Sequence, residues 1–301
     1  MIGAVGHTVW KYRIFYIFIL PMFLLVILFG IYPIIKSIQM SFTASGTSLS
    51  SKPEYIFFSN YVSIFKDPYF LDSLRITLLF TIFSVPLNIM VAFLLALILG
   101  SPILKKGSVF FKLSVFLPVV VPSMAAAVVW KWLYNVNFGP ISAICNYLGL
   151  PEFSGLANVH TVLPSLGAVE LWKHVGLYTV IFVTNLQLID KEMYEAAFLE
   201  GANYLQRTLL ITIPELSPAF KLNIVYATIQ FLKTFTVSLV MTQGGPNFAS
   251  NFVSYYAYSK FKLANYGEAT AMGTVLFVLV ILISLSAKKI LSMERSTRGT
   301  I

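Results

Sequence analysis

The chain has 301 residues, of which 57% are hydrophobic and 11% are charged, and its formal net charge is +9. Soluble globular proteins carry charge on about 25% of their residues, so this composition excludes an ordinary soluble domain. The positive charge does not indicate nucleic-acid binding, because the basic residues lie at the edges of apolar runs. Cys145 is the only cysteine, which excludes a disulfide framework and a cysteine-based metal site.

Six apolar runs are long enough to cross a bilayer core, which takes about 20 helical residues. They cover residues 14–35, 74–100, 109–133, 162–188, 216–242 and 266–289. Prolines interrupt the first three runs, at Pro33, Pro86, Pro118 and Pro122. Membrane helices tolerate proline where neighbouring helices satisfy the freed backbone groups. The pattern predicts an all-α, multi-pass membrane protein with six transmembrane helices and a single membrane domain over residues 1–301.

The first apolar run follows Lys11 and Arg13 and therefore resembles a secretory signal peptide. Its apolar stretch is longer than that of a cleaved signal, and no small-x-small cleavage site follows it. We expect an uncleaved first membrane helix.

The basic residues concentrate in alternate gaps between the apolar runs. The richer gaps, together with the adjoining ends of the runs, contain Lys11, Arg13, Lys105, Lys106, Lys112, Lys191, Arg207, Lys288, Lys289, Arg295 and Arg298. By the positive-inside rule these gaps are cytoplasmic, which places both termini inside. The opposite gaps are poorer in basic residues but still contain Lys52, Lys66, Lys260 and Lys262.

The segments expected on the outer side are too short to form a soluble domain. The first contains a turn-forming cluster at residues 42–46 and continues to Asn60 in what we expect to be a small cap. Residues 141–148 read as a short helix at the interface, and residues 243–247 as a sharp loop.

The polar stretch at residues 190–213, between the fourth and fifth runs, is longer and more helix-prone than a simple connection requires. Asp190 can cap a helix that ends at Gly201, a residue suited to the left-handed backbone that follows many helices. Asn203 and Gln206 have the spacing of a capping box that opens a second short helix. The residues predict two short helices joined at a glycine; an amphipathic interfacial loop is the alternative.

This stretch closely resembles the E-A-A-x3-G-x9-I-x-L-P motif of the permease subunits of binding-protein-dependent ABC importers. The resemblance assigns contact with the ATPase to Glu195, Ala196, Ala197, Gly201, Ile211 and Pro214. Ile213 replaces the usual leucine, and Leu205 and Thr208 replace aromatic residues common in the second helix.

The resemblance extends over nearly the whole chain and is to the carbohydrate-uptake branch related to the maltose transporter permeases. Similar segments occur in the family's order at residues 32–38, 41–42, 116–118, 130–133, 170–173 and 242–246. The resemblance implies a MetI-like fold in a bacterial or archaeal cytoplasmic (inner) membrane. It also implies a second homologous permease, a homodimeric ABC ATPase, an extracytoplasmic solute-binding protein and a carbohydrate cargo. The chain lacks a G-x-x-x-x-G-K-[ST] loop, so we expect no enzyme activity and no cofactor here, with ATP and Mg bound by the partner ATPase.

Polar residues inside the apolar runs are candidates for a substrate pathway, because side chains of this kind rarely face lipid. Glu170 and Lys173 share a helix face and could form a structural ion pair. Polar residues also recur at three- and four-residue steps in the fifth run and so share one helix face. This face could line the substrate pathway or contact a partner permease. The candidate pathway residues are Tyr226, Gln230, Lys233, Thr234, Phe235, Glu170 and Lys173. The two lysines suggest an acidic oligosaccharide as one hypothesis for the cargo.

The sequence therefore predicts one membrane subunit of an ATP-driven importer for a sugar or oligosaccharide. A related importer for glycerol phosphate or a polyamine is the nearest alternative. A secondary transporter should show paired repeats with broken helices at matched positions, and neither is visible. The polar residues inside the fifth run argue against a membrane scaffold without transport activity. His160 and His174 have no second ligand at metal-binding spacing.

Overall fold

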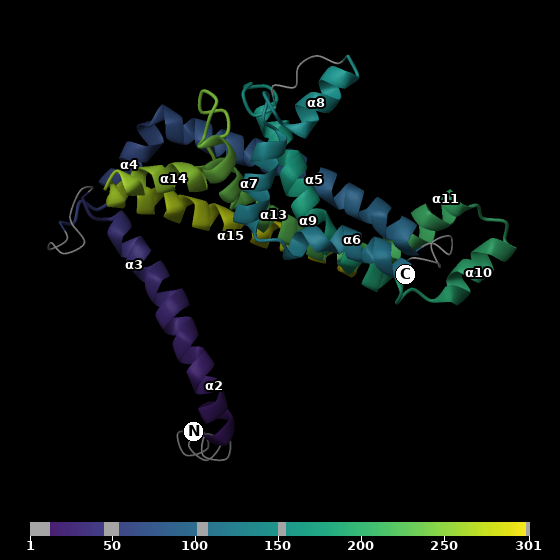
Figure 1. Ribbon diagram of the computed structural model, residues 1–301. Helices are drawn as coiled ribbons and strands as arrows, with labels where there is room; N and C mark the ends of the chain where they lie inside the picture. The colour runs from purple at the N-terminus through teal and green to yellow at the C-terminus, as the bar shows by residue number, and fades with distance from the viewer. Residues whose placement is uncertain (1–12, 45–53, 101–107, 150–154, 299–301) are drawn as a thin grey trace. The chain divides into compact units, whose positions relative to one another are not determined.

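The computed structural model describes residues 13–44, 54–100, 108–149 and 155–298 (Figure 1). Within these ranges the chain is mostly helical and forms no strand, apart from one isolated bridge between Thr43 and Tyr55. The all-α class is therefore confirmed. Several residues used above lie outside the described residues, namely Lys11, Ser45, Gly46, Lys52, Lys105 and Lys106.

Short π-helical turns, marked η, occur among the α-helices. The first half of the chain forms α2 (Arg13–Val26), η1 (Ile27–Ile31), α3 (Tyr32–Ser41), α4 (Ser59–Lys66), α5 (Pro68–Gly100), α6 (Ser108–Val120), α7 (Ser123–Leu133) and α8 (Pro140–Tyr147). The second half forms α9 (Val162–Leu186), α10 (Lys191–Leu199), α11 (Tyr204–Arg207), η3 (Thr208–Thr212), α12 (Ile213–Glu215), α13 (Ser217–Leu232), η4 (Ser238–Thr242), α14 (Val253–Lys262) and α15 (Tyr266–Arg298).

Four helical segments of the described chain are long and apolar enough to cross a membrane, and α6 with α7 makes a fifth if this bent pair is one span. The four are Ile17–Ser41, Pro68–Gly100, Val162–Leu186 and Tyr266–Ser286. They correspond to the first, second, fourth and sixth predicted runs. That the chain has six membrane spans and that both termini are cytoplasmic remain predictions.

The third and fifth predicted runs differ from continuous helices. The third bends by 101° between α6 and α7, where Pro122 lacks the N–H that would continue the helix. In the fifth run the helix ends at Leu232, so α13 has only 16 residues. Neither glycine nor proline marks this second break; the polar residues Lys233 and Thr234 lie there instead.

The chain divides into two compact units, residues 1–66 with 257–274 and residues 67–256 with 275–301. In the first unit, Nδ2 of the buried Asn60 donates to the carbonyl oxygens of Ser41 (2.8 Å) and Thr43 (2.7 Å). Gly267 lies against the same turn, because an added Cβ would come within 2.3 Å of the Thr43 oxygen. These contacts form the small cap predicted near Asn60.

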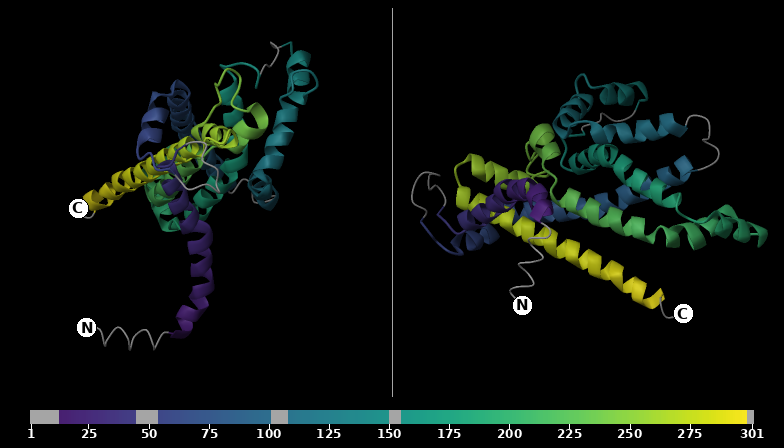
Figure 2. Two further views of the ribbon diagram at one scale, coloured as in Figure 1. Left: turned by 90° about the vertical axis from the view of Figure 1, so that its left-hand side faces the viewer. Right: turned by 90° about the horizontal axis from the view of Figure 1, so that it is seen from below.

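The second unit is built on α5, α9 and α13, which lie side by side (Figures 1 and 2). Aromatic rings fill the space between them: Phe182 contacts Phe220 with centroids 4.7 Å apart, and Phe80 contacts Phe231 at 5.9 Å. Beyond one end of these helices, α10 and α11 project from the unit (Figure 1). The short helix predicted at residues 141–148 is present as α8, and its position at the interface stays a prediction. The sharp loop after η4 is confirmed by left-handed backbone at Gln243 and Gly244.

Candidate functional site: a polar cavity and a projecting helix pair

The corner between α6 and α7 leaves carbonyl groups without helical donors. Pro122 has no N–H, so it cannot donate to the Pro118 oxygen, its partner four residues earlier. The Pro118 oxygen receives the Val121 N–H at 3.3 Å, and α7 begins again only at Ser123. In the interior of a membrane each such carbonyl needs a partner from the protein.

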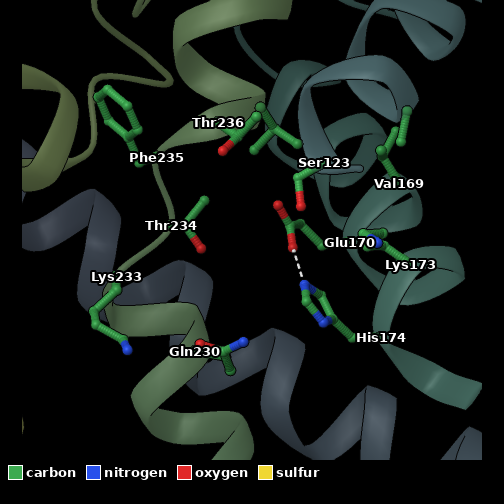
Figure 3. A pocket seen from close by; sticks show the side chains of 12 residues that line it. Ser123, Val169, Glu170, Lys173, His174, Gln230, Lys233, Thr234, Phe235 and Thr236 are labelled. Carbon is green, nitrogen blue, oxygen red and sulfur yellow. Dashed lines mark ion pairs between the residues drawn. The ribbon is translucent and has the colours of Figure 1, made fainter. Parts of the chain in front are cut away.

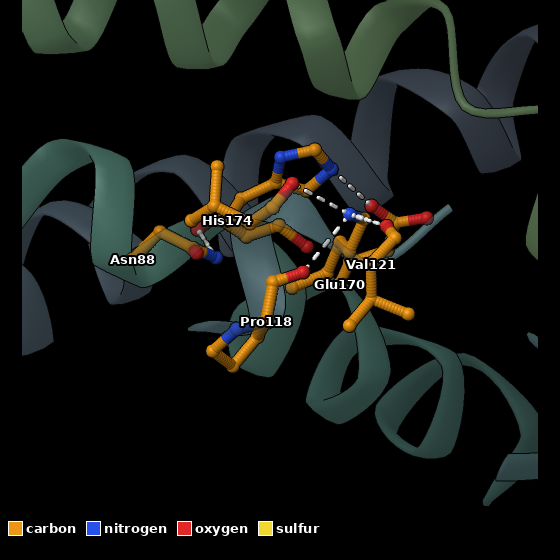
Figure 4. Close-up of polar contacts among 8 residues, drawn as sticks. Asn88, Pro118, Val121, Glu170 and His174 are labelled. Carbon is orange, nitrogen blue, oxygen red and sulfur yellow. Dashed lines mark hydrogen bonds and ion pairs between the residues drawn. The ribbon is translucent and has the colours of Figure 1, made fainter. Parts of the chain in front are cut away.

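Lys173 of α9 supplies these partners. Its Nζ donates to the carbonyl oxygens of Pro118 and Val119, both at 3.0 Å, and to that of Val121. An ammonium group has three N–H donors, so these three acceptors use all of them. Figure 4 shows the carbonyl groups of Pro118 and Val121 turned toward the same point. Lys173 is 8% exposed, and its charge also complements the negative C-terminal end of α6.

Glu170 has a different partner from the one predicted. Its Oε2 lies 3.0 Å from Nε2 of His174, one helical turn along α9, rather than pairing with Lys173 (Figures 3 and 4). This contact is an ion pair when the imidazole is protonated. Sequence reasoning missed His174 in this role, although its four-residue spacing from Glu170 could have indicated it.

A cavity of about 290 Å³ lies beside this pair. It is lined by Ser123, Ala126, Val169, Glu170, Lys173, His174, Gln230, Lys233, Thr234, Phe235, Thr236 and Val237. In Figure 3, Gln230 and Thr234 lie on one side of the cavity and Ser123, Glu170 and His174 on the other. Hydroxyl, amide, imidazole and carboxylate groups from three separate segments therefore share one space.

The structure thus brings together six of the seven predicted pathway residues. The exception is Tyr226, which does not line the cavity. Its ring is half-exposed and contacts that of Tyr178, with centroids 6.2 Å apart. The break after α13 explains why Lys233, Thr234 and Phe235 reach the cavity in succession, because consecutive residues of a helix would point to different faces. The cavity residues Ser123 and Thr236 were not foreseen. Ser123 follows the predicted interruption at Pro122, but the sequence does not show which way the chain turns there, and Thr236 lies in a break that no proline or glycine marks.

The projecting pair begins with α10, whose end has the expected geometry. The N–H of Gly201 donates to the Phe198 oxygen (3.0 Å), and the N–H of Ala202 donates to the Ala197 oxygen (2.9 Å). These two bonds form a Schellman motif, and Gly201 has the left-handed φ of +82° that the motif requires. Asp190 occupies the N-cap position, but its side chain makes no capping hydrogen bond. The capping interaction predicted for Asp190 is therefore wrong.

The second helix of the pair starts with the predicted capping box. The Asn203 side chain accepts from the Gln206 N–H (2.9 Å), and the Gln206 side chain accepts from the Asn203 N–H (2.8 Å). The helix continues through η3 and α12 toward α13. The hydroxyl groups of Tyr194 and Thr212 hydrogen-bond at 2.9 Å, which ties α10 to the helix that leads into α13.

The motif residues lie along this pair with different exposures. Glu195, Ala196 and Gly201 are exposed, whereas Ala197, Ile211 and Pro214 are partly buried. Large apolar side chains are also exposed on this polar segment, at Phe198, Leu199, Tyr204, Leu205, Leu209 and Leu210. Such a concentration of exposed apolar side chains is typical of an interaction surface.

Comparison with known proteins gives a consistent result, although no protein-family model matches the chain. The trehalose/maltose transport system permease protein MalF of Thermococcus litoralis is 30% identical over 274 residues, which are 90% of this chain and 92% of that protein. The diacetylchitobiose uptake system permease protein NgcF of Streptomyces coelicolor is 31% identical over 74% of this chain and 67% of its own length.

The fold is also that of a solved transporter. A chain of a bacterial alginate ABC transporter, crystallised with an alginate pentasaccharide-bound periplasmic protein, superposes with a TM-score of 0.83. The alignment covers 93% of this chain and 94% of that chain at 22% identity. Together with the apolar helices, these matches identify a multi-pass membrane protein and confirm the resemblance drawn from the sequence. The chain belongs to the family of ABC transporter permease subunits that includes the trehalose/maltose permease.

Proposed function

We propose that this chain forms one half of the membrane channel of an ABC importer that translocates a sugar or oligosaccharide. The observation that carries the proposal is the cavity between α7, α9 and residues 230–237, where polar groups converge inside an apolar helical unit. Sugars are bound through hydroxyl groups, which need donors and acceptors such as those of Ser123, Gln230 and Thr234. The volume of about 290 Å³ lies at the lower end of small-molecule sites.

The comparisons support this cargo class. The relatives described above are named for trehalose, maltose and diacetylchitobiose, and the alginate transporter was crystallised with a periplasmic protein that carries an oligosaccharide. We therefore propose that an extracytoplasmic binding protein delivers the cargo and that a second homologous permease completes the channel.

The projecting helix pair is proposed to receive the ATPase. Its exposed apolar side chains and the exposed Glu195 offer a surface for docking. A displacement of α10 reaches α13 through the Tyr194–Thr212 bond and the continuous helix from Tyr204 to Glu215. Because α13 leads to Gln230 and Lys233, movement of this pair would alter one wall of the cavity. ATP and Mg would be bound and ATP hydrolysed by two copies of the partner ATPase.

The topology completes the proposal. The chain would form a single membrane domain with six spans and both termini in the cytoplasm of a bacterial or archaeal cell. In this arrangement α6 with α7, and α13 with η4, are broken third and fifth spans. Non-helical backbone at membrane depth occurs where it lines a cavity, and both breaks contribute residues to the cavity.

Reconstitution tests this function. The complex would be purified from membranes through a tag on this chain, incorporated into liposomes, and supplied with its binding protein and radiolabelled maltose or chito-oligosaccharides. We expect sugar uptake that requires ATP on the side of the ATPase. Uptake driven by a proton or sodium gradient without ATP would contradict the proposal and favour a secondary transporter.

A further inference from the structure

We infer that Lys173 is a positioning residue that fixes the corner between α6 and α7 and thereby the shape of the cavity. It acts on the cargo through the position of α7 and not by direct contact. The relevance to transport rests on the proposed function, whereas the effect on the position of α7 does not.

The first step concerns the donors that Lys173 has available. All three N–H groups of its ammonium are used by the carbonyl oxygens of Pro118, Val119 and Val121. A cargo hydroxyl or carboxylate could bind Lys173 only by displacing one of these carbonyl groups. Displacement would leave that carbonyl without its ammonium partner in a water-poor setting, which is unfavourable.

The second step concerns how firmly the ammonium is held. Gly176 lies three residues after Lys173 and therefore near the same face of α9. A Cβ added at Gly176 would lie 2.2 Å from the carbonyl oxygen of Val115 and 3.1 Å from Cγ2 of Val119. The backbone of α9 thus touches α6 next to the corner, so the base of the lysine side chain has little freedom to move away.

The third step links the corner to the cavity. The first turn of α7 starts at Ser123, directly after the corner, and contributes Ser123 and Ala126 to the cavity wall. Glu170 and His174 of α9 contribute to the same side of the cavity. The Lys173 bonds join α9 to the end of α6 and to Val121, from which the chain turns into α7, so their loss would allow the start of α7 and the cavity wall to move.

The other end of α7 is held in a similar way. Nζ of Lys131 donates to the carbonyl oxygen of Val240 in η4 at 3.1 Å, and the Trp130 ring packs edge-on against Trp172 at 5.6 Å. With this end fixed, removal of the Lys173 bonds should let the start of α7 pivot about its far end. The change should therefore be a defined displacement and not loss of the whole fold.

Distance measurements between spin labels test the inference in the assembled complex. Labels would be placed at Met124 in the first turn of α7 and at Val180 in α9, which are both exposed, after Cys145→Ala removes the native thiol. Lys173→Met removes all three donors at similar length, Lys173→Arg keeps donors and charge, and Lys112→Met removes a lysine of α6 away from the corner. Uptake of a neutral sugar would be measured for the same variants.

We expect Lys173→Met to shift or broaden the distance distribution and to lower the uptake rate at saturating sugar at least tenfold. Lys173→Arg keeps the charge and several donors but arranges the donors in a planar fork, so it should shift the distribution less and lower uptake less than Lys173→Met does. Lys112→Met should match the parent in both measurements.

An unchanged distribution in Lys173→Met would overturn the inference, as would equal shifts in the Met and Arg variants. If Lys173→Met does not reach the membrane, Lys173→Gln, which has two N–H donors and no charge, takes its place, and an unchanged distribution in that variant overturns the inference. If the parent complex transports no sugar, the proposed function fails, and the distance measurements still decide the role of Lys173.

Discussion

Replacing Gly201 by valine should impair the coupling of the ATPase to transport, and the cause should be a local change in the backbone. Gly201 has a φ of +82°, and a Cβ added there meets no atom within 4 Å. The substitution therefore causes no clash. It raises the free energy of the folded state only because a residue with a Cβ must adopt left-handed backbone, which costs about 1–2 kcal/mol. The two hydrogen bonds of the Schellman motif contribute about 1 kcal/mol each to stability. The cost of the substitution is therefore comparable to their combined contribution.

A graded series at this position tests the argument. Asparagine tolerates the left-handed region, alanine less well, and a β-branched residue least, so ATP-dependent uptake should fall in the order Gly, Asn, Ala, Val. Uptake would be measured in proteoliposomes that contain equal amounts of complex.

Gly149 provides a matched control. It also has a left-handed φ, +65°, with nothing within 4 Å of an added Cβ, but it follows α8. Gly149→Val should therefore leave uptake near the parent rate. Full uptake by Gly201→Val, or equal loss in both valine variants, would refute the reasoning.

Three further predictions follow from individual contacts. Gly176→Ala should shift α6 from α9 by about 1 Å, because the added Cβ would lie 2.2 Å from the Val115 oxygen. A misplacement of this size can lower a rate about 100-fold. Unchanged uptake would contradict the close packing of the two helices. Asn60→Ala leaves two carbonyl groups without their side-chain donor and should lower the free energy of unfolding by about 2 kcal/mol, seen as a lower melting temperature of the detergent-solubilised complex. Lys233 lines the cavity and is exposed, and no ion pair is found for it in the described ranges. If the cargo is acidic, Lys233→Gln should reduce uptake of uronate-containing glycans more than uptake of neutral ones; equal effects on both would remove that hypothesis.

Local rules of helix formation predicted the projecting pair well. The capping box at Asn203 and the glycine stop at Gly201 depend only on residues within one turn, and both are confirmed. The cap predicted at Asp190 is absent, since a suitable residue at the N-cap position does not ensure that its side chain turns toward the helix.

Tertiary partners could not be predicted in the same way. The three-residue spacing placed Glu170 and Lys173 near one another, but the partner of Lys173 is the end of α6, which is 55 residues away in the sequence at Pro118, so no local pattern pairs the two. Pro122 was recognised as an interruption, yet the size of the bend, 101°, cannot be read from a proline alone. The end of α13 at Leu232 has no glycine or proline to mark it and was missed for that reason.

The acidic-cargo hypothesis also changes in the light of these contacts. It was based on two lysines, and one of them is bound to the carbonyl groups of α6. A carboxylate in the cavity would therefore have to interact with Lys233.

The central claim is that a partner ATPase acts on this subunit through α10 and α11. Site-specific photo-cross-linking from the exposed Ala196, in the complex as purified from membranes, tests it most directly, with the exposed Leu148 after α8 as the control position. We predict that Ala196 cross-links to the nucleotide-binding subunit and that Leu148 does not. Absence of that subunit from the Ala196 products, or labelling of this residue only from the outer side of the membrane, would contradict the account.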